Sequence, residues 1–596
     1  MSTRKRTTDK DKPPKYVGLD TETVNGRAVL ICTPDLACYP ESWRGCVDFL
    51  FSTGARDYIT WNVTYDSQAI LSYVPRTVMA RLREHNRVRY RSCSIRYIPR
   101  KQLQITNHRI GRTVAFWDCY PYFDSSLDAA AGTWLGERKM LIPKKWLEDM
   151  SVPLSRPRDR ARVELYCKRD AGLTQRLWEI VEAQYIAIGV SPHRAPGPAT
   201  IARRAFPEIY DFRNVPRRVQ GLFRRSYYGG RSEIVRRGRV GRAYYYDIHS
   251  AYPSALEQCE DPRESTLVLA RRGKPPRSDA MYGTYKTRVE IPLDTPFGPL
   301  PYRSNNHPLI YPVGVFLTWI TRPELEMLRA YGFNHEVLGG AELLRTGAAP
   351  LFPPGVIREL YARRKANPNV ALALKKTMNC LYGKFAETRV IHVQHKHGYL
   401  PCSARRGEDG RWRYPIEIPT THTHYAVAAH VTATIRVRLF AAAMHYPKSV
   451  VSMATDGIVT TRKLPLKRGS GLGQWGVSYE AAEFVQLGNG IYCYRITGER
   501  DWNERRRGIR DPGFYERVHN RRRRTVPVCV MRAISLAEAA RTGYRNLNIM
   551  TRITKNLDVN MDTKRVWPAE LRTYAEAFRS QQRSRPWIIA PRGVIQ

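Results

Sequence analysis

The sequence is poor in acidic residues and contains no long apolar run. Its 596 residues include 54 aspartates and glutamates against 98 lysines and arginines, a formal charge of +44 at pH 7. This balance favours a polyanionic partner over an acidic protein or a small neutral substrate, and an aromatic content of 11% favours nucleic acid. No segment approaches the roughly 20 apolar residues of a membrane span. We therefore expect no membrane partner.

The cysteines do not form a recognisable framework. There are 11 of them, without any C-x-x-C pair, and Cys32, Cys38 and Cys46 have no companion at zinc-finger spacing. The basic N-terminus is too polar for a secretory signal. We expect reduced packing cysteines and a cytoplasmic protein, located in the host cytoplasm if the chain is viral.

Changes in residue pattern divide the chain. The first 15 residues are charged and contain prolines, which predicts a basic flexible tail. Short strands then alternate with helical stretches until the run 191–198, rich in Pro and Gly, breaks the pattern, so we place a domain boundary at residue 190. Beyond it we expect a helix over about 354–387 and an Arg-rich end after residue 488. The class is multidomain α/β and α+β.

Two aspartates far apart in the sequence stand at strand ends. Asp247 ends the apolar and aromatic run Ala243–Tyr246, and Asp456 stands at the tip of a predicted hairpin. If the fold joins them, they can hold two divalent ions, Mg²⁺ or Mn²⁺, that activate a primer 3′ hydroxyl and neutralise a triphosphate. The pair therefore indicates metal-assisted nucleotidyl transfer.

A helical segment offers partners for a nucleotide. Lys375, Asn379 and Tyr382 are spaced at i, i+4 and i+7 and so share one helix face. The ammonium can hold a triphosphate and the ring can hold a base. Tyr252, one turn beyond Asp247, can pack under the incoming sugar and exclude a 2′ hydroxyl. The alternatives are a solvated basic face for the helix and an ordinary core tyrosine for Tyr252.

Four further acids lie in the N-terminal part. Asp20 and Glu22 point to the same side of an extended segment, Asp66 and Asp170 follow, and Tyr166 lies one helical turn before Asp170. Four acids can bind two metal ions about 4 Å apart, while the tyrosine orients an attacking water. The set predicts phosphodiester hydrolysis, although each acid singly is also compatible with an ordinary surface position.

Taken together, these segments resemble family B DNA polymerases that carry a 3′-5′ exonuclease. The Asp247 segment matches D-x-x-S-L-Y-P with Ala251 for Leu, the helix matches K-x-x-x-N-S-L-Y-G with Cys380 for Ser, and the Asp456 segment matches Y-x-D-T-D-S in part. The upstream acids match D-x-E, N-x-x-Y-D and Y-x-x-x-D in the expected order. The resemblance implies a ribonuclease H-like exonuclease domain over 16–190 and a right-hand polymerase domain over 191–596.

The short chain is similar to the protein-primed branch used by bacteriophages and linear plasmids. That resemblance implies a monomer that acts on primer-template DNA and deoxynucleoside triphosphates, takes a terminal protein as primer, displaces the opposite strand and replicates a viral or plasmid-type genome. It implies a palm at 191–355 and 425–490, a priming-protein insertion within 260–350, fingers at 356–387, a strand-displacement insertion at 388–424 and a thumb at 491–596.

The resemblance also implies residues that contact DNA. They are Tyr227, Gly229 and Gly230 of a Y-x-G-G element, Asn62, Tyr65, Ser126 and Leu127 in the exonuclease domain, and Tyr492 of a K-x-Y element. Ser126 could instead cap a helix. Lys144 or Lys145 is the expected exonuclease lysine.

The sequence departs from the family at two elements. Ala454 replaces the first aspartate of the third polymerase motif, and Gly457 replaces its serine. Gly490 replaces the lysine of K-x-Y, where a neighbouring arginine would have to supply the charge. Two rival functions stay open: a primer-independent family B polymerase, and a DNA-binding nuclease whose polymerase site has decayed.

Overall fold

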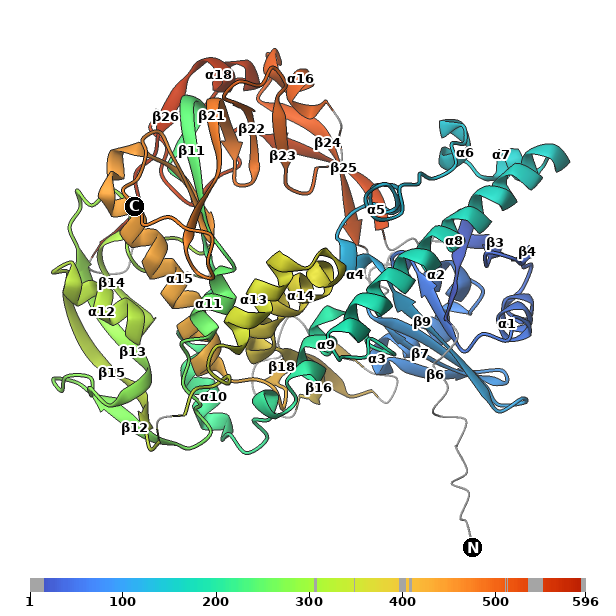
Figure 1. The fold of residues 1–596 in the computed structure, drawn as a ribbon, viewed down its shortest axis with the longest axis horizontal. Coiled ribbons are helices and arrows are strands. Elements are labelled where there is room, and N and C mark those ends of the chain that lie inside the picture. The colour runs from blue at the N-terminus through green and yellow to red at the C-terminus, as the bar shows by residue number, and fades with distance from the viewer. Residues whose placement is uncertain are drawn as a thin grey trace, which may run out of the picture. The chain divides into compact units, whose positions relative to one another are not determined.

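The computed structural model describes residues 16–304, 308–347, 349–395, 404–406, 410–509, 511, 513–533 and 550–590 (Figure 1). The chain forms two compact units. The first comprises Met1–Ala205, Arg363–Thr377 and Met531–Ile553, and the second comprises Phe206–Ala362, Met378–Val530 and Thr554–Gln596. The predicted basic tail, residues 1–15, lies outside the described residues.

The first unit is built on a six-stranded sheet. Three strands are parallel, and the other three continue the sheet in antiparallel fashion. The order is β1 (Tyr16–Gly18), β5 (Asp57–Thr60), β9 (Arg112–Asp118), β8 (Gln102–Asn107), β7 (Cys93–Ile98) and β6 (Arg87–Tyr90). Every residue of β5 is buried, as expected for a parallel strand that is covered on both faces.

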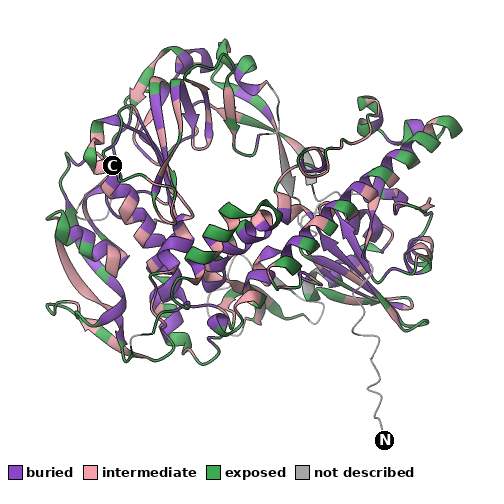
Figure 2. Cartoon of the chain, viewed as in Figure 1, coloured by how far each residue is buried: buried purple, intermediate pink, exposed green. Residues whose placement is uncertain are grey.

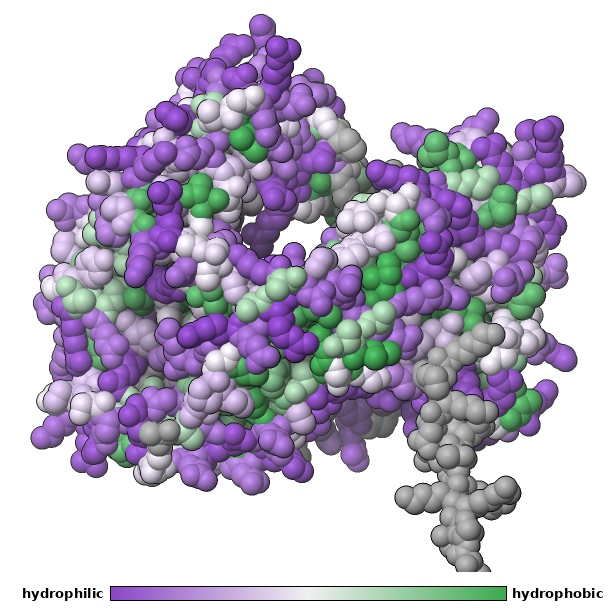
Figure 3. All heavy atoms as spheres, in the orientation of Figure 1, coloured by the Kyte–Doolittle hydropathy of each residue, from purple (hydrophilic) through white to green (hydrophobic). Residues whose placement is uncertain are grey.

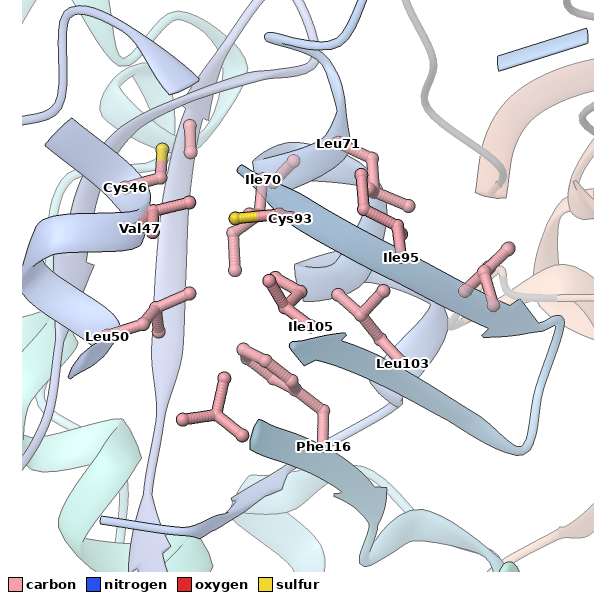
Figure 4. Packing of buried hydrophobic residues seen from close by; sticks show 14 of the residues in the cluster. Cys46, Val47, Leu50, Ile70, Leu71, Cys93, Ile95, Leu103, Ile105 and Phe116 are labelled. Atoms are coloured by element: carbon pink, nitrogen blue, oxygen red, sulfur yellow. The ribbon is translucent and has the colours of Figure 1, made fainter. Parts of the chain in front are cut away.

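Successive residues of the central strands enter two separate cores. Tyr58 and Phe116 pack into one of them, together with α1 (Trp43–Ser52) and α2 (Val63–Leu71). Figure 4 shows how side chains from both helices meet those from β7, β8 and β9. Ile59 and its neighbours face the other core, which includes residues of α8 (Pro157–Ala187). Period-two alternation therefore builds both faces of the sheet.

A small second sheet branches from β1. Only Leu19 separates β1 from β2 (Asp20–Val24), which pairs with β3 (Arg27–Cys32), and β3 pairs with β4 (Ala37–Cys38). Helix α8 begins with Pro157 at its first position, where the missing N–H costs nothing, and packs against β1, β2 and β3. The other helices of this unit are α3 (Arg76–His85), α4 (Tyr120–Phe123), α5 (Leu127–Trp134), α6 (Lys144–Glu148), α7 (Ser151–Leu154) and α9 (Pro198–Ala205).

The first unit extends beyond the boundary expected at residue 190. Ala195 and Ile201 of the following segment are buried in the same core cluster as Trp178. The Pro- and Gly-containing run therefore precedes a short helix, α9, that belongs to this unit. A break in local pattern marks the end of a helix, but packing decides where a unit ends.

The second unit contains a larger mixed sheet. Its strand order is β10 (Arg231–Ile234), β19 (Val450–Thr455), β20 (Gly457–Thr460), β11 (Arg236–Ile248), β21 (Trp475–Gly488), β22 (Ile491–Ile496) and β23 (Asn503–Arg506), and β26 (Gln581–Arg583) also pairs with β11. The apolar helix α15 (Tyr425–His445) packs against β19 and β20. By length and composition it could span a membrane, but 67% of its most apolar stretch is buried (Figure 2). Its side chains form core.

Two further sheets fall within the predicted insertions. The first has the order β12 (Ser265–Arg271), β15 (Asn334–Arg345), β13 (Ala280–Ile291), β14 (Val313–Thr321) and β27 (Ile588–Ile589), so all but its last strand come from 260–350. The second joins β16 (Thr388–Gln394), β18 (Trp412–Pro419) and β17 (Arg405–Arg406). In it β16 and β18 form an antiparallel ladder from Thr388 opposite Pro419.

The helix predicted over 354–387 is interrupted. It consists of α13 (Val356–Ala366), α14 (Pro368–Leu381) and the 3₁₀ turn η2 (Tyr382–Ala386). Pro368 removes a backbone donor and restricts Asn367, so it starts a new helix instead of continuing the old one. The remaining elements are η1 (Glu208–Tyr210), α10 (Arg217–Arg224), α11 (Ala251–Leu256), α12 (Arg322–Ala330), η3 (Pro447–Ser449), α16 (Phe514–His519), β24 (Thr525–Ala533), β25 (Met550–Asp558) and α18 (Tyr574–Arg579).

Candidate active sites

The main sheet of the second unit places Asp247 beside Asp456. Asp247 on β11 lies opposite Gly457, the first residue of β20. The backbone N–H of Ile248 donates to the carbonyl of Asp456 at 3.0 Å. Two aspartates that are distant in sequence therefore meet where the β19–β20 turn abuts the end of β11.

The two carboxylates repel each other in a half-buried site. Burial raises the pKa of Asp247 to about 7, and the negative charge of Asp456 adds to this effect. Burial also raises the pKa of Asp456. A divalent cation between the two groups would remove the repulsion and favour their ionised forms. The residues therefore suit a hard metal ion such as Mg²⁺, which oxygen ligands bind.

The turn that presents Asp456 is strained. The Asp456 N–H donates to the carbonyl of Ala454 at 2.7 Å, which closes a three-residue turn around Thr455. Thr455 has φ of +65°, a left-handed conformation that a β-branched residue rarely adopts and that costs about 1–3 kcal/mol. The surrounding packing holds this conformation. A Cβ at Gly230 would lie 3.0 Å from Thr455 Cγ2 and 2.5 Å from the Tyr252 hydroxyl.

Tyr252 and Tyr382 form a stacked pair next to this turn. Their ring centroids are 4.5 Å apart with an interplanar angle of 14°. The negative charge of Asp456 contributes to raising the pKa of both phenols, after burial as the main cause. Asn379 is exposed on α14, and the exposed Lys375 lies on the part of α14 that belongs to the first unit.

The Y-x-G-G element is fixed by a buried arginine that sequence reasoning missed. Arg436 of α15 donates to the carbonyls of Tyr228 and Gly229, both at 2.9 Å. It also pairs with buried Glu324, at 3.0 and 2.6 Å. The Tyr227 ring packs 5.7 Å from that of Tyr425. Two arginines, Arg436 and Arg438, in an otherwise Ala-rich and apolar helix were the signal that could have identified it.

Three of the four predicted acids of the first unit lie close to a thiol or a hydroxyl group. Asp20 and Glu22 lie near the thiol of Cys167, and Asp66 lies near the hydroxyl of Thr21. Single carboxylate oxygens of Asp20 and Glu22 and the sulfur of Cys167 all lie within 4.8 Å of one another. Asp66 accepts a hydrogen bond from Thr21 Oγ1 at 2.8 Å, next to Asp20 in sequence. Burial raises the pKa of Asp20 to about 7, and the charge of Asp170 adds to it.

The other acids of this cluster behave in the same way. Burial, reinforced by the charge of Asp20, raises the pKa of both Glu22 and Asp66 well above the ordinary range. Several buried carboxylates that oppose one another's ionisation form a strong site for cations. The donor set fits divalent metal ions.

Lys139 is the cation that this site already contains. Its Nζ pairs with Asp170 and lies 4.8 Å from the centroid of the Tyr166 ring. Burial opposes its charge, but the negative charges of Asp170 and Asp20 help to raise its pKa above the ordinary value. The expected lysines, Lys144 and Lys145, are instead exposed at the start of α6. Lys139 lies in a segment without regular structure, so no periodicity pointed to it.

The remaining predicted exonuclease residues are held by local contacts. Asn62 has φ of +75° before α2, and its N–H donates to the missed residue Asp118 at 2.9 Å. The Tyr65 hydroxyl is 2.8 Å from Thr23 Oγ1. Ser126 accepts from the N–H of Ala129 at 3.2 Å and so caps α5, the alternative that its sequence left open. Leu127 is buried and Tyr492 stacks on Phe484 at 5.1 Å.

Comparisons with known proteins show which family and which fold this chain resembles. Residues 158–393 match the family model described as DNA polymerase type B, organellar and viral. A solved structure, phi29 DNA polymerase complexed with primer-template DNA and incoming nucleotide substrates, aligns over 92% of this chain and 100% of its own, with a TM-score of 0.64 and 14% identity. This chain has the fold of phi29 DNA polymerase. The shared fold confirms the predicted fold class, a multidomain α/β and α+β protein.

Two curated relatives are similar over shorter segments. A probable DNA polymerase of Agaricus bitorquis is 27% identical over 201 residues, and one of Podospora anserina is 29% identical over 163 residues. The matched segments span 30% and 27% of this chain but only 23% and 13% of those proteins. The match to the type B family model confirms the resemblance to family B polymerases stated from the motifs.

Proposed function

We propose that this protein is a template-directed DNA polymerase with a 3′-5′ proofreading exonuclease. The observation that carries the proposal is the meeting of Asp247 and Asp456 at a strained turn beside the stacked Tyr252 and Tyr382. The family B match and the phi29-like fold support it. The face drawn in Figure 3 is largely hydrophilic, and the charge of +44 suits a polyanionic substrate.

Asp247 and Asp456 would hold the metal ions of the polymerase site. Bound there, two Mg²⁺ ions would lower the pKa of the primer hydroxyl and neutralise the leaving pyrophosphate. The left-handed Thr455 fixes where the Asp456 carboxylate points. Tyr252 packs against Gly230 and Tyr382. Its ring would lie beside the carboxylates, where it can exclude an incoming nucleotide that carries a 2′ hydroxyl.

Asp20, Glu22, Asp66 and Asp170 would hold the ions of the exonuclease site. Tyr166 and Lys139 lie next to Asp170, where they can orient a water and balance negative charge on a phosphate. The acids of the second unit would thus serve primer extension, and those of the first unit would serve primer shortening.

The test is primer extension by purified protein with Mg²⁺ or Mn²⁺ on a primed template. We expect extension with nucleotides and shortening of the primer without them. A protein that degrades but never extends would support the rival of a nuclease with a decayed polymerase site.

We further propose priming by a terminal protein. The sheet that takes four of its five strands from 260–350 supports this, since the protein-primed branch carries its docking insertion there. Labelled nucleotides with an unprimed circular template distinguish the alternatives. De novo products would favour the primer-independent rival, whereas products that require an added protein hydroxyl would favour protein priming.

Strand displacement is the last part of the proposal. The β16–β18 ladder supports it, because relatives use a hairpin at this position to encircle the template. Deleting residues 390 to 420 should leave filling of short gaps intact and abolish synthesis through duplex DNA, measured on gapped and nicked templates. Displacement at the undeleted rate would contradict the assignment.

A further inference from the structure

A cavity of about 850 Å³ lies at the end of the main sheet of the second unit that is remote from the carboxylate pair. Ser449, in the lining of this cavity, directly precedes β19, whereas Asp456 directly follows that strand. The six residues of β19 span about 20 Å, since a strand rises about 3.3 Å per residue. A ligand in this cavity therefore lies away from the place where a primer end would meet Asp247 and Asp456.

The lining of the cavity is strongly basic. Among the described residues that line it, Asp294 is the only acid, and the exposed cations are Lys448, Arg462, Arg583 and Arg585. No ion pair joins any of these four cations to an acid in the part of the chain that the structure describes. The cavity therefore presents positive charge that an anionic ligand would balance.

Two guanidinium groups lie close together at one side of the cavity. Arg583 donates to the carbonyl of Pro447 at 3.3 Å, and Arg236 donates to the next carbonyl, that of Lys448. Burial lowers the pKa of Arg583, and the positive charge of Arg236 adds to this effect. A phosphate beside Arg583 would reduce this repulsion and accept charge-assisted hydrogen bonds.

Buried contacts hold the walls of the cavity in place. Arg565, which is 2% exposed, donates to the carbonyl of Pro296 at 2.8 Å and to Ser584 Oγ at 2.7 Å. It also pairs with the buried Glu233 at 2.7 Å. Two segments of the wall are therefore fixed to one buried ion pair, so a ligand does not need to order them.

The uncharged part of the lining offers flat and apolar surfaces. The guanidinium carbon of Arg462 lies 4.0 Å from the centroid of the Tyr446 ring. Leu293 is 64% exposed, and the rest of this surface comes from Pro296, Pro447 and Pro586. Proteins bind single-stranded nucleic acid by stacking its bases on aromatic and arginine side chains within a basic groove. Because all four cations are exposed, the cavity suits a strand that lies across the surface better than a small molecule enclosed by protein.

We propose that this cavity is a second nucleic-acid site, which binds a single strand outside the primer-template path through Arg462, Arg583 and Arg585. The phosphates would contact the three guanidinium groups, and a base would pack beside Tyr446 and Leu293. A polymerase that copies duplex DNA releases one such strand, so the site is compatible with the proposed function and goes beyond it.

The experiment measures binding of a short, labelled circular oligothymidylate by fluorescence anisotropy. The circle has no 3′ end for either acid cluster, and one equivalent of unlabelled hairpin primer-template occupies the proposed polymerase site. Divalent metal is left out, so that no DNA is degraded. We expect the wild-type complex to bind the circle. Arg462→Ala with Arg585→Ala should weaken that binding about tenfold or more, because each substitution removes a charge-assisted contact. The slope of log affinity against log salt should fall by about 1.4, since each single-strand phosphate contributes about 0.7.

The matched control is Lys286→Ala with Arg288→Ala, which removes two exposed cations of β13 outside the cavity. It should keep the wild-type affinity for the circle. Equal losses in the two double variants, no loss in the first, or no binding by the wild-type complex would overturn the proposal. An unchanged temperature of thermal unfolding shows that each variant is folded, and Arg462→Gln with Arg585→Gln replaces the alanine pair if that pair unfolds.

Free nucleotides are the other source of phosphate. A strand reaches several cations at once, so the unlabelled circle should displace the labelled one at concentrations about a hundredfold lower than dTTP. Equal potency of dTTP would assign the cavity to a nucleotide and overturn the assignment to a strand. These are binding measurements without metal, whereas the proposed function fails when a primer is not extended, so the two failures are distinguishable.

Discussion

The two acidic sites of this protein balance buried negative charge differently. In the first unit the acid cluster contains an internal cation, because Lys139 pairs with Asp170 and its charge opposes the raised pKa of Asp20 and of Glu22. In the second unit Asp247 and Asp456 face each other, and neither forms an ion pair with any of the residues that the structure describes. In the proposed exonuclease site a lysine of the chain itself therefore balances part of the negative charge, whereas the proposed polymerase site would need bound metal and substrate to balance all of it.

The largest effect is expected when acids are removed from one site at a time, which tests whether the two sites act independently. Asp247→Ala and Asp456→Ala should each lower primer extension by about 10³-fold or more, since losing a metal ligand removes several kcal/mol of stabilisation. Degradation of single-stranded DNA should persist. Asp20→Ala with Asp66→Ala should do the reverse.

Asp35→Ala, at an exposed acid of the first unit, is the matched control and should change neither activity. Loss of both activities from any one variant would mean that the two sites are not independent. That outcome would contradict the assignment of one reaction to each unit.

The next test removes the internal cation. Lys139→Met should reduce exonuclease activity by about 10²-fold, because a positioned charge that stabilises a transition state is worth about that much. Primer extension should not change. Lys139→Arg should recover part of the exonuclease rate, and full activity in Lys139→Met would show that the lysine has only a structural role.

The pH dependence of metal binding sharpens the comparison. The raised pKa values of Asp20 and Asp247, each about 7, mean that protons compete with metal below neutrality. Mn²⁺ affinity at each site should fall about tenfold per pH unit below 7 for each proton released. In Lys139→Met the exonuclease dependence should move to higher pH, since its carboxylates lose a neutralising charge.

The raised pKa values also predict how the stability of the metal-free protein changes with pH. Carboxyl groups with raised pKa values bind more protons in the folded than in the unfolded chain. The contribution of these groups to stability should therefore fall as pH rises from about 4 to 7 without metal, and Mg²⁺ should restore it. Thermal unfolding measures this contribution as the difference between the wild-type chain and Asp20→Asn or Asp247→Asn, and a difference that does not change with pH would contradict the raised values.

Sequence predicted the parts of the sites that depend on local pattern. Asp247 could be read from the apolar run it ends, and the order of the motifs gave the fold. Lys139 could not be predicted, because it reaches Asp170 from a segment without periodicity. The arginine expected near Gly490 could not be identified either: pairing of β22 with β23 brings Arg507 next to Gly490, and no spacing in the sequence encodes that approach. The end of the first unit at Ala205 likewise followed from burial of Ile201.

The smallest expected effect concerns the thiol that distinguishes the two sites. The sulfur of Cys167 shares a cluster with Asp20 and Glu22, and among the described residues no similar group includes Asp247 or Asp456. Thiolate ligands favour Zn²⁺ and related soft ions over Mg²⁺. Zn²⁺ should therefore inhibit the exonuclease at concentrations that spare synthesis.

Cys167→Ser should weaken that inhibition severalfold and leave the Mg²⁺-dependent rate almost unchanged, because oxygen ligands suffice for Mg²⁺. Zn²⁺ titrations of primer shortening and primer extension in the same preparation measure the difference, with extension as the internal control. Equal Zn²⁺ sensitivity of the two activities, or no change in the serine variant, would mean that the thiol does not reach the metal. The contrast between the sites would then rest on charge alone.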